Sequence, residues 1–301
     1  MPGTDRDRDT LAKLKELGAA PDEQAAFAAL LLEQRSSLAV VASALDILAQ
    51  TPIPSARPAL LKRYAHFDAD GPHRDSGGSS RILIIKALRQ LGRQDDVPLL
   101  ERAARTYEYS LYDHAEIGGA LRAEALTALA DVDPEQASYH AVRLLVDSQT
   151  DEMSGEPAAT AARILAAQGH LLPLYACAMQ GSRFPEVTAE ALRGLARLPD
   201  SLLPTVMERD WEAEGEGVLA GLYDLLLQHR ARAVTMPFLK DQLLTTKREE
   251  VFKYLATMMV ADGRDDLLTL LDEVIREEMR PSRRATPVSY THLTLPTILR
   301  V

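Results

Sequence analysis

The residues with the clearest capacity for chemistry lie between His66 and Ser80, in a stretch rich in Gly, Asp and Ser. Carboxylates and imidazoles bind divalent cations, and four such side chains are close in sequence here: His66, Asp68, Asp70 and His73, with Asp75 following. The Asp-x-Asp-Gly fragment is similar to the start of a calcium loop, but the later bidentate Glu of an EF-hand is missing. A solvated turn explains the same residue types. We therefore predict no metal site and keep the four residues as the alternative.

A second candidate is the aromatic and acidic segment from Tyr107 to Glu116 (YEYSLYDHAE). Tyrosine is favoured at recognition sites because it supplies apolar area with a polar tip. Tyr107, Tyr109 and Tyr112 are therefore candidate binding residues for a cationic peptide or protein surface. In the alternative interpretation, these rings cover the ends of neighbouring helices.

Four arginines form a third candidate set. Arg89, Arg163 and Arg193 each follow, by two residues, a small residue that opens a recurring apolar phrase, and Arg122 lies close to the same position. Aligned on one face, they would form a basic stripe able to bind an acidic peptide or a phosphate. The alternative is an ordinary solvated helix face.

Motifs for catalysis or cofactor binding are missing from the sequence. It contains no Gly-x-Ser-x-Gly, no Gly-x-Gly-x-x-Gly, no P-loop and no His-Glu-x-x-His. We therefore predict no catalytic residues and no cofactor.

The candidate residues must be positioned by a recurring helical unit. A small residue followed four positions later by a large one opens seven phrases, which start at Ala44, Ala87, Ala125, Ala161, Ala191, Gly221 and Leu255. Their spacings are 43, 38, 36, 30, 30 and 34 residues. Apolar steps of three and four residues predict amphipathic helices, and the loose period predicts stacked repeats. No unit buries its apolar stripe alone, so each depends on its neighbours.

Prolines mark the first helix of most repeats, which precedes the second helix that carries the phrase. Pro58, Pro98, Pro173, Pro204 and Pro237 each precede apolar residues, as expected at the first turn of a helix. This two-helix unit resembles HEAT repeats, closest to the bacterial kind related to the HEAT-like repeats of phycobilisome lyases. The resemblance implies an all-α fold, an α-solenoid or superhelix of about seven two-helix repeats. It covers roughly residues 20 to 278, although the usual Asp/Val-Arg turn before the second helix is mostly absent.

The resemblance and the missing motifs favour a non-enzymatic scaffold that binds another protein or peptide through its concave face and inserted loops. One alternative is an enzyme or chaperone similar to bilin lyases, which attach tetrapyrroles to proteins. Another is a nucleic-acid enzyme similar to the HEAT-like alkylpurine DNA glycosylases. The single tryptophan, Trp211, lies among acidic residues that would repel a phosphate backbone, which argues against the last alternative.

Composition limits the partner and the location. The 301 residues carry a formal net charge of −10, which argues against a nucleic-acid partner. Apolar residues make up 46% and aromatic residues 5%, so Ala and Leu must fill the core. One cysteine excludes a disulfide framework. With no apolar run long enough for a signal peptide or a membrane span, we expect a cytoplasmic protein without membrane contact.

The chain is expected to divide into an N-terminal helical cap over residues 1–20, the repeat array over 21–279 and a disordered tail over 280–301. Within the tail, Pro287-Val-Ser-Tyr-Thr-His-Leu-Thr-Leu-Pro-Thr297 loses the helical pattern. This string is similar to the translation of a transposase sequencing adapter. We therefore expect residues 287–301 to be adapter read-through, with the natural C-terminus and further repeats missing.

Overall fold

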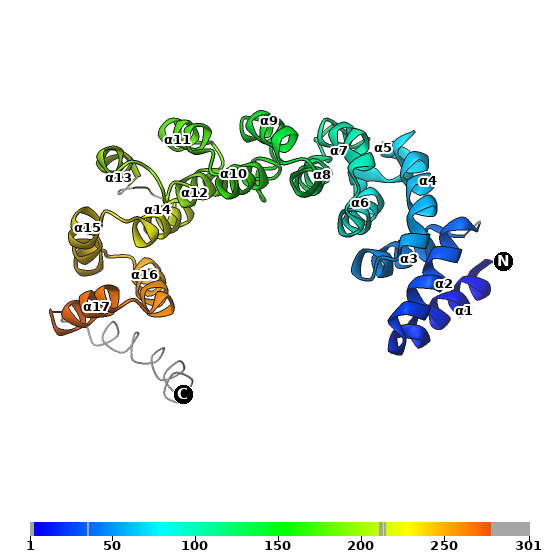
Figure 1. Ribbon diagram of the computed structural model, residues 1–301, viewed down its shortest axis with the longest axis horizontal. Helices are drawn as coiled ribbons and strands as arrows, with labels where there is room; N and C mark the ends of the chain where they lie inside the picture. The colour runs from blue at the N-terminus through cyan, green and yellow to red at the C-terminus, as the bar shows by residue number, and fades with distance from the viewer. Residues whose placement is uncertain (1–2, 35, 211–212, 214, 278–301) are drawn as a thin grey trace. The chain divides into compact units, whose positions relative to one another are not determined.

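The computed structural model describes residues 3–34, 36–210, 213 and 215–277 (Figure 1). Trp211 and the predicted tail over 280–301, with its adapter-like stretch, lie outside these residues. In the described ranges all regular structure is helical, and the one β pairing is an isolated antiparallel bridge between Tyr109 and Glu116. The prediction of an all-α fold is confirmed.

Contacts group the chain into two compact units, residues 1–164 and 165–301, where the sequence predicted one array over 21–279. The helices of the first unit are α1 (Gly3–Glu16), α2 (Pro21–Glu33), α3 (Leu38–Gln50), α4 (Arg57–Asp68), α5 (Gly71–Arg74), α6 (Ser79–Leu91), α7 (Val97–Ala104), α8 (Gly119–Val132) and α9 (Pro134–Leu145). Helix α10 (Ala158–Ala167) begins in this unit and ends in the second. The predicted N-terminal cap region is helical over α1.

Within the first unit the helices pack in two layers (Figure 1). Helices α3, α6 and α8 pack in succession, each against the next. Helix α2 packs against α3 and α4, α4 packs against α6, and α8 contacts both α7 and α9. Each helix therefore buries its apolar stripe against helices that are close in sequence.

The second unit is built in the same way. Its helices are α11 (Leu171–Gln180), α12 (Pro185–Arg193), α13 (Leu203–Asp210), α14 (Glu216–Gln228), α15 (Arg232–Thr245), α16 (Glu249–Asp262) and α17 (Asp265–Glu277). Helices α12, α14 and α16 form one row, and α11, α13, α15 and α17 form the other (Figure 1). Contacts between the rows include α11 with α12, α14 with α13 and α15, and α16 with α17.

The recurring phrase forms the centre of both units. Its seven small or apolar first residues lie in seven different helices, α3, α6, α8, α10, α12, α14 and α16. All seven are buried, and five of them are alanines with no exposed surface. In the first six phrases a small side chain lets the next helix approach closely, and the leucine four residues later fills the space between them.

Helix ends follow from local chemistry. The Ser37 hydroxyl accepts a hydrogen bond from the Val40 amide at the start of α3, and Asp133 accepts one from the Gln136 amide in α9. Helices α6 and α16 end at Gly92 and Gly263, whose positive φ angles of 56° and 72° suit glycine.

The prolines behave as predicted with one exception. Pro58, Pro98, Pro173 and Pro204 fall within the first three residues of α4, α7, α11 and α13. Pro237 instead lies inside α15, which begins five residues earlier because the Ala231 carbonyl accepts the Val234 and Thr235 amides. The carbonyl that Pro237 leaves without a partner belongs to Ala233, an exposed residue, so water can satisfy it.

None of the helices in the described part of the chain combines the length and the hydropathy that a bilayer crossing requires.

Helices α12 and α14 approach closely at Gly221. A Cβ atom at this position would lie 2.6 Å from the carbonyl oxygen and 2.7 Å from the Cα of Ala189. We expect Gly221→Ala to lower the free energy of unfolding by about 1–3 kcal/mol, because helix backbone must move apart. Urea unfolding followed by far-ultraviolet circular dichroism measures this change.

Gly217→Ala is the matched control in the same helix, because a Cβ at Gly217 meets no atom within 4 Å. It should raise the free energy of unfolding by at most about 1 kcal/mol through helix propensity. Equal unfolding midpoints for the two variants would contradict close packing at Gly221.

Candidate functional site

Two arginines are fully buried in the first unit, and the sequence analysis missed the first of them. The Arg81 guanidinium donates to Glu108 with both terminal nitrogens, at 2.6 and 2.7 Å, and from Nε to Asp75 at 3.0 Å. Asp75 also accepts the backbone amides of Ser80 and Arg81, so it caps α6. Burial lowers the pKa of Arg81, but the hydrogen bonds that it donates to Glu108 and Asp75 outweigh this effect and raise the pKa, which keeps the guanidinium charged.

Arg122 is held in the same way in α8. Its terminal nitrogens donate to Glu116 at 2.7 and 2.9 Å, and one of them also donates to the Gln149 carbonyl at 3.0 Å. The guanidinium carbon lies 4.2 Å from the centre of the Tyr107 ring, a cation–π contact. The Tyr107 hydroxyl donates to Asp147 at 2.9 Å.

These two clusters share one geometry. Each arginine binds a carboxylate six residues before it and a group 27 residues after it, Glu108 for Arg81 and the Gln149 carbonyl for Arg122. Each arginine therefore ties the segment before its own helix to a loop further along the chain of the same unit. An acidic residue six positions before an arginine is the sequence signal that could have shown this.

The prediction that Arg122 belongs to an exposed basic stripe is wrong. Arg122 is fully buried, because two carboxylates and a tyrosine ring enclose its guanidinium. The other three arginines lie nearer the surface, each beside a carboxylate. Arg89 lies 2.5 Å from Asp131, Arg163 lies 2.5 Å from Glu156, and Arg193 lies 2.7 Å from Asp224. Each positive charge therefore already has a negative partner.

Replacing Arg122 should lower the free energy of unfolding far more than replacing Arg89. Arg122→Met leaves Glu116 and Asp147, whose side chains are each only 5% exposed, without their cation. We expect a loss of about 3–5 kcal/mol in the free energy of unfolding, as for other broken buried ion pairs. Chemical denaturation measures it.

Arg89→Met removes the same charge from an exposed pair, for which we expect about 0–1 kcal/mol. Adding Glu116→Gln to Arg122→Met should recover part of the loss. Equal stabilities of the two single variants would contradict a structural role for Arg122.

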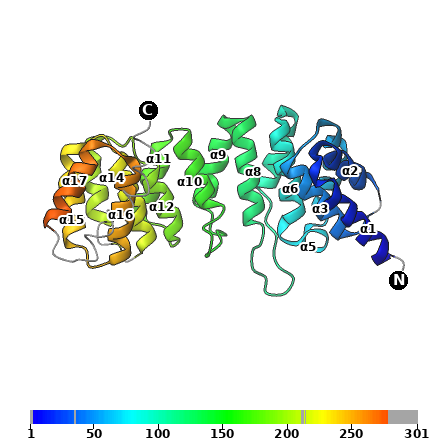
Figure 2. The same ribbon diagram turned by 90° about the horizontal axis from the view of Figure 1, so that it is seen from below.

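The three tyrosines of the aromatic segment have two different environments. Tyr107 is held by a cation–π contact with Arg122 and a hydrogen bond to Asp147. Beyond it, the Ser110 amide donates to the Ala115 carbonyl and the Ile117 amide to the Glu108 carbonyl, both at 2.8 Å, which closes a narrow loop. Tyr109 is 47% and Tyr112 98% exposed on this loop, which extends past the end of α8 (Figure 2). The loop therefore has a fixed base and an exposed aromatic tip.

The candidate metal ligands do not converge. Asp68 lies 3.2 Å from Arg102, and Asp70 lies 2.8 Å from His73. In the described ranges, three or more His, Cys, Asp or Glu side chains nowhere gather in a way that could hold a metal ion. The stretch is also not the solvated loop that its composition suggested, because α4 extends to Asp68, α5 follows and Asp75 turns inward to Arg81.

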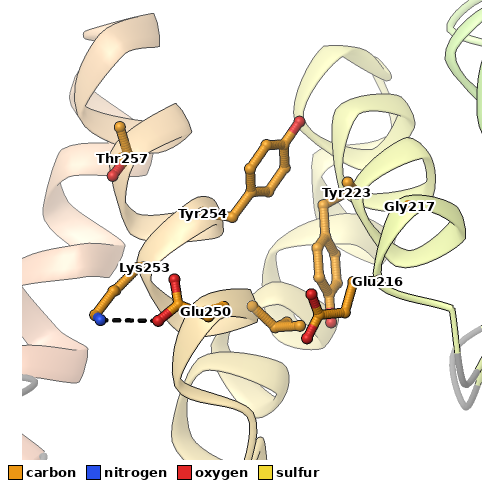
Figure 3. Close-up of a pocket in the computed structure, with 9 residues that line it drawn as sticks. Glu216, Gly217, Tyr223, Glu250, Lys253, Tyr254 and Thr257 are labelled. Atoms are coloured by element: carbon orange, nitrogen blue, oxygen red, sulfur yellow. Dashed lines mark hydrogen bonds and ion pairs between the residues drawn. The ribbon is translucent and has the colours of Figure 1, made fainter.

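A pocket of about 510 Å³ opens in the second unit between α14 and α16 (Figure 3). Tyr223 and Tyr254 form its aromatic walls, and Glu216 and Glu250 lie together at one end. Lys253 donates to Glu250 at 3.0 Å. The remaining lining residues are small or apolar apart from one threonine: Gly217, Ala220, Val251 and Thr257.

Hydrogen bonds hold both phenol rings in place. The Tyr254 hydroxyl reaches both carboxylate oxygens of Asp224, at 2.8 and 2.9 Å, and Asp224 also accepts from Arg193 Nε at 2.7 Å. The Tyr223 hydroxyl donates to Gln242 at 3.1 Å. Burial first, then the bond to Asp224, raises the pKa of Tyr254 to about 12, and burial raises the pKa of Tyr223 to about 12. Both rings are therefore neutral walls at ordinary pH.

Charge in this pocket comes from Glu216, Glu250 and Lys253, two negative groups and one positive. Glu216 has no hydrogen-bond or ion-pair partner among the residues described. Carboxylates beside aromatic faces attract a cation, both by charge and by the ring quadrupole. This pocket could not be predicted from the sequence pattern, because its residues come from two helices whose phrases start 34 residues apart.

Comparison with known proteins gives no match, whether with family models, curated proteins or solved structures.

The phenol of Tyr254 should make stability fall at high pH. Its pKa is about 12 when folded and about 10 when unfolded, so the unfolded chain ionises first as pH rises. This contribution is present below pH 10 and is lost as the pH approaches 12. We expect Tyr254→Phe to flatten the pH dependence of the unfolding free energy in this window, measured by urea unfolding at several pH values. An unchanged pH dependence in this window would contradict a raised pKa of Tyr254 in the folded chain.

Proposed function

We propose that this chain is a non-enzymatic scaffold, an α-solenoid of about seven HEAT-like two-helix repeats that binds another protein. Two observations support the repeat interpretation: the seven phrases lie in seven helices with buried first residues, and each unit has two layers of helices joined in sequence order. Repeats of this kind present one row of helices along a continuous binding surface.

The pocket between α14 and α16 is the observation that carries the binding proposal. Helices α12, α14 and α16 form one row, and this pocket lies between its last two members (Figure 3). Its two aromatic walls, and Glu216 with no partner among the described residues, suit the side chain of a partner's arginine or lysine. The partner is therefore proposed to carry an exposed basic residue beside apolar ones.

Inserted loops are the second part of the proposal. The loop between α7 and α8 exposes Tyr109, Leu111 and Tyr112 on a base that Arg122 fixes. Exposed aromatic side chains on a rigid base lose little entropy on binding, which favours contact with a protein surface.

A peptide selection tests the pocket. A randomised peptide library is displayed on phage and selected on the immobilised full chain, and enriched peptides are measured by fluorescence anisotropy. We expect enriched peptides to contain Arg or Lys, and replacement of that residue by citrulline or Gln to weaken binding about tenfold, which corresponds to about 1.4 kcal/mol. The double variant Glu216→Gln/Glu250→Gln should cause a similar loss.

The control is Asp22→Asn/Glu23→Gln, which removes the same charge from the exposed first turn of α2. It should leave affinity within about twofold, because Asp22 and Glu23 do not line the pocket and exposed charges outside it are screened by salt. Enriched peptides without a basic residue, or equal losses for the two double variants, would overturn the proposed role of this pocket.

A further inference from the structure

A second pocket, in the first unit, has the opposite chemistry. It has a volume of about 450 Å³, lies between α7 and α9, and is lined by Arg105, Gln136, Tyr139, His140 and Arg143. Each lining side chain has an N–H or O–H donor, and none of them is acidic. This is notable in a chain whose net charge is −10. Such a wall of donors suits an anion.

Hydrogen bonds within the chain hold Arg143 and His140 in place, but one nitrogen of each side chain has no partner in the described structure. Arg143 donates to the Ala104 carbonyl at 2.6 Å and to the Tyr107 hydroxyl at 3.1 Å. His140, only 4% exposed, bonds through Nε2 to Glu101 at 3.2 Å. Within the described chain, Arg143 Nε and His140 Nδ1 are buried without a hydrogen-bond partner. The N–H dipole of Arg143 Nε is therefore uncompensated, and a nearby anion would offset it.

Arg105 is the group that can reach a ligand directly. Its side chain is 64% exposed, and its one ion-pair partner within the described residues is Glu101 at 3.7 Å, beyond hydrogen-bond distance. A guanidinium pairs with a carboxylate through two parallel hydrogen bonds. Glu101 is the only acid that contacts these basic groups in the described structure, so two arginines and a histidine face one negative charge.

An exposed apolar stripe begins at the same pocket. Tyr139, Val142 and Val146 are 70%, 45% and 75% exposed, at steps of three and four residues along α9 and its C-terminal end. Residues at this spacing share one helix face. Tyr139 belongs to both the pocket and the stripe. The surface therefore combines an apolar strip with a carboxylate-binding end.

We propose that the face formed by α7 and α9 binds an acidic amphipathic helix of another protein. A Glu or Asp of that helix pairs with Arg105 in the donor-lined pocket, and its apolar side chains cover Tyr139, Val142 and Val146. Helices bind grooves through apolar anchors at three- and four-residue steps, which matches the stripe. Charge complementarity selects an acidic partner. The site is separate from the pocket between α14 and α16, and neither proposal depends on the other.

Two fluorescein-labelled peptides test this site on the full chain. The first is a designed helix with Leu at three- and four-residue steps flanked by Glu, and the second replaces each Glu by Gln. We expect the Gln peptide to bind about tenfold more weakly in fluorescence anisotropy, a difference of about 1.4 kcal/mol. Inorganic phosphate added alone should not displace the Glu peptide beyond the effect of an equal ionic strength of NaCl.

Variants locate the binding. Arg105→Glu should weaken the Glu peptide about tenfold or more, and a Lys version of the peptide should regain affinity for this variant. Val142→Asp should weaken both peptides. Arg93→Glu makes the same charge change at another exposed site of this unit and should alter affinity at most about twofold. Circular dichroism checks that each variant is folded.

Three results would overturn the proposal: equal binding of the Glu and Gln peptides, equal losses for Arg105→Glu and Arg93→Glu, or displacement by phosphate beyond the salt effect. Peptides selected for the pocket between α14 and α16 should bind Arg105→Glu as they bind the unmodified chain. Failure of one site is thereby distinguishable from failure of the other.

Discussion

The close approach of neighbouring helices in one row is the constraint on which the rest of the structure depends. Each helix of the two rows has an apolar stripe that only its neighbours can cover, and the small first residue of each phrase sets how near they come. Gly221 is the limiting case, because backbone atoms of Ala189 occupy the place of a side chain. Once the rows are packed, the positions of loops, buried charges and pockets follow from where the helices begin and end.

Buried arginines then hold the loops around them in place. Arg81 and Arg122 lie inside the first unit because carboxylates and carbonyls from the segments on either side surround them. Two such charges are costly to bury unless nearly every donor is used, and most of theirs are. In the second unit, the buried Asp224 of α14 has a similar role and joins Arg193 of α12 to Tyr254 of α16. Polar contacts thus connect helices that apolar packing has already placed in register.

The sequence predicted the helices better than the sites. Three- and four-residue apolar steps depend only on local geometry, so the all-helical fold and the buried phrases could be predicted from it. Pro237 was placed wrongly because a helix can begin before a proline when another residue supplies the first carbonyl. Arg122 looked like a surface residue because its enclosing groups, Glu116 and Asp147, come from segments outside the recurring phrases. Each pocket combines residues from two different segments of one unit, and a one-dimensional pattern does not show which of them meet.

The ion pairs of Arg81 and Arg122 have a consequence for the loop between α7 and α8. Glu108 and Glu116, at the two ends of the loop, are each fixed by a different buried arginine, whereas the residues between Tyr109 and Ala115 are mostly at the surface. The tip can therefore change in length or composition while the stack beneath it keeps its contacts. This makes the loop a natural place for new specificities to arise, and a suitable position for grafting a foreign recognition sequence.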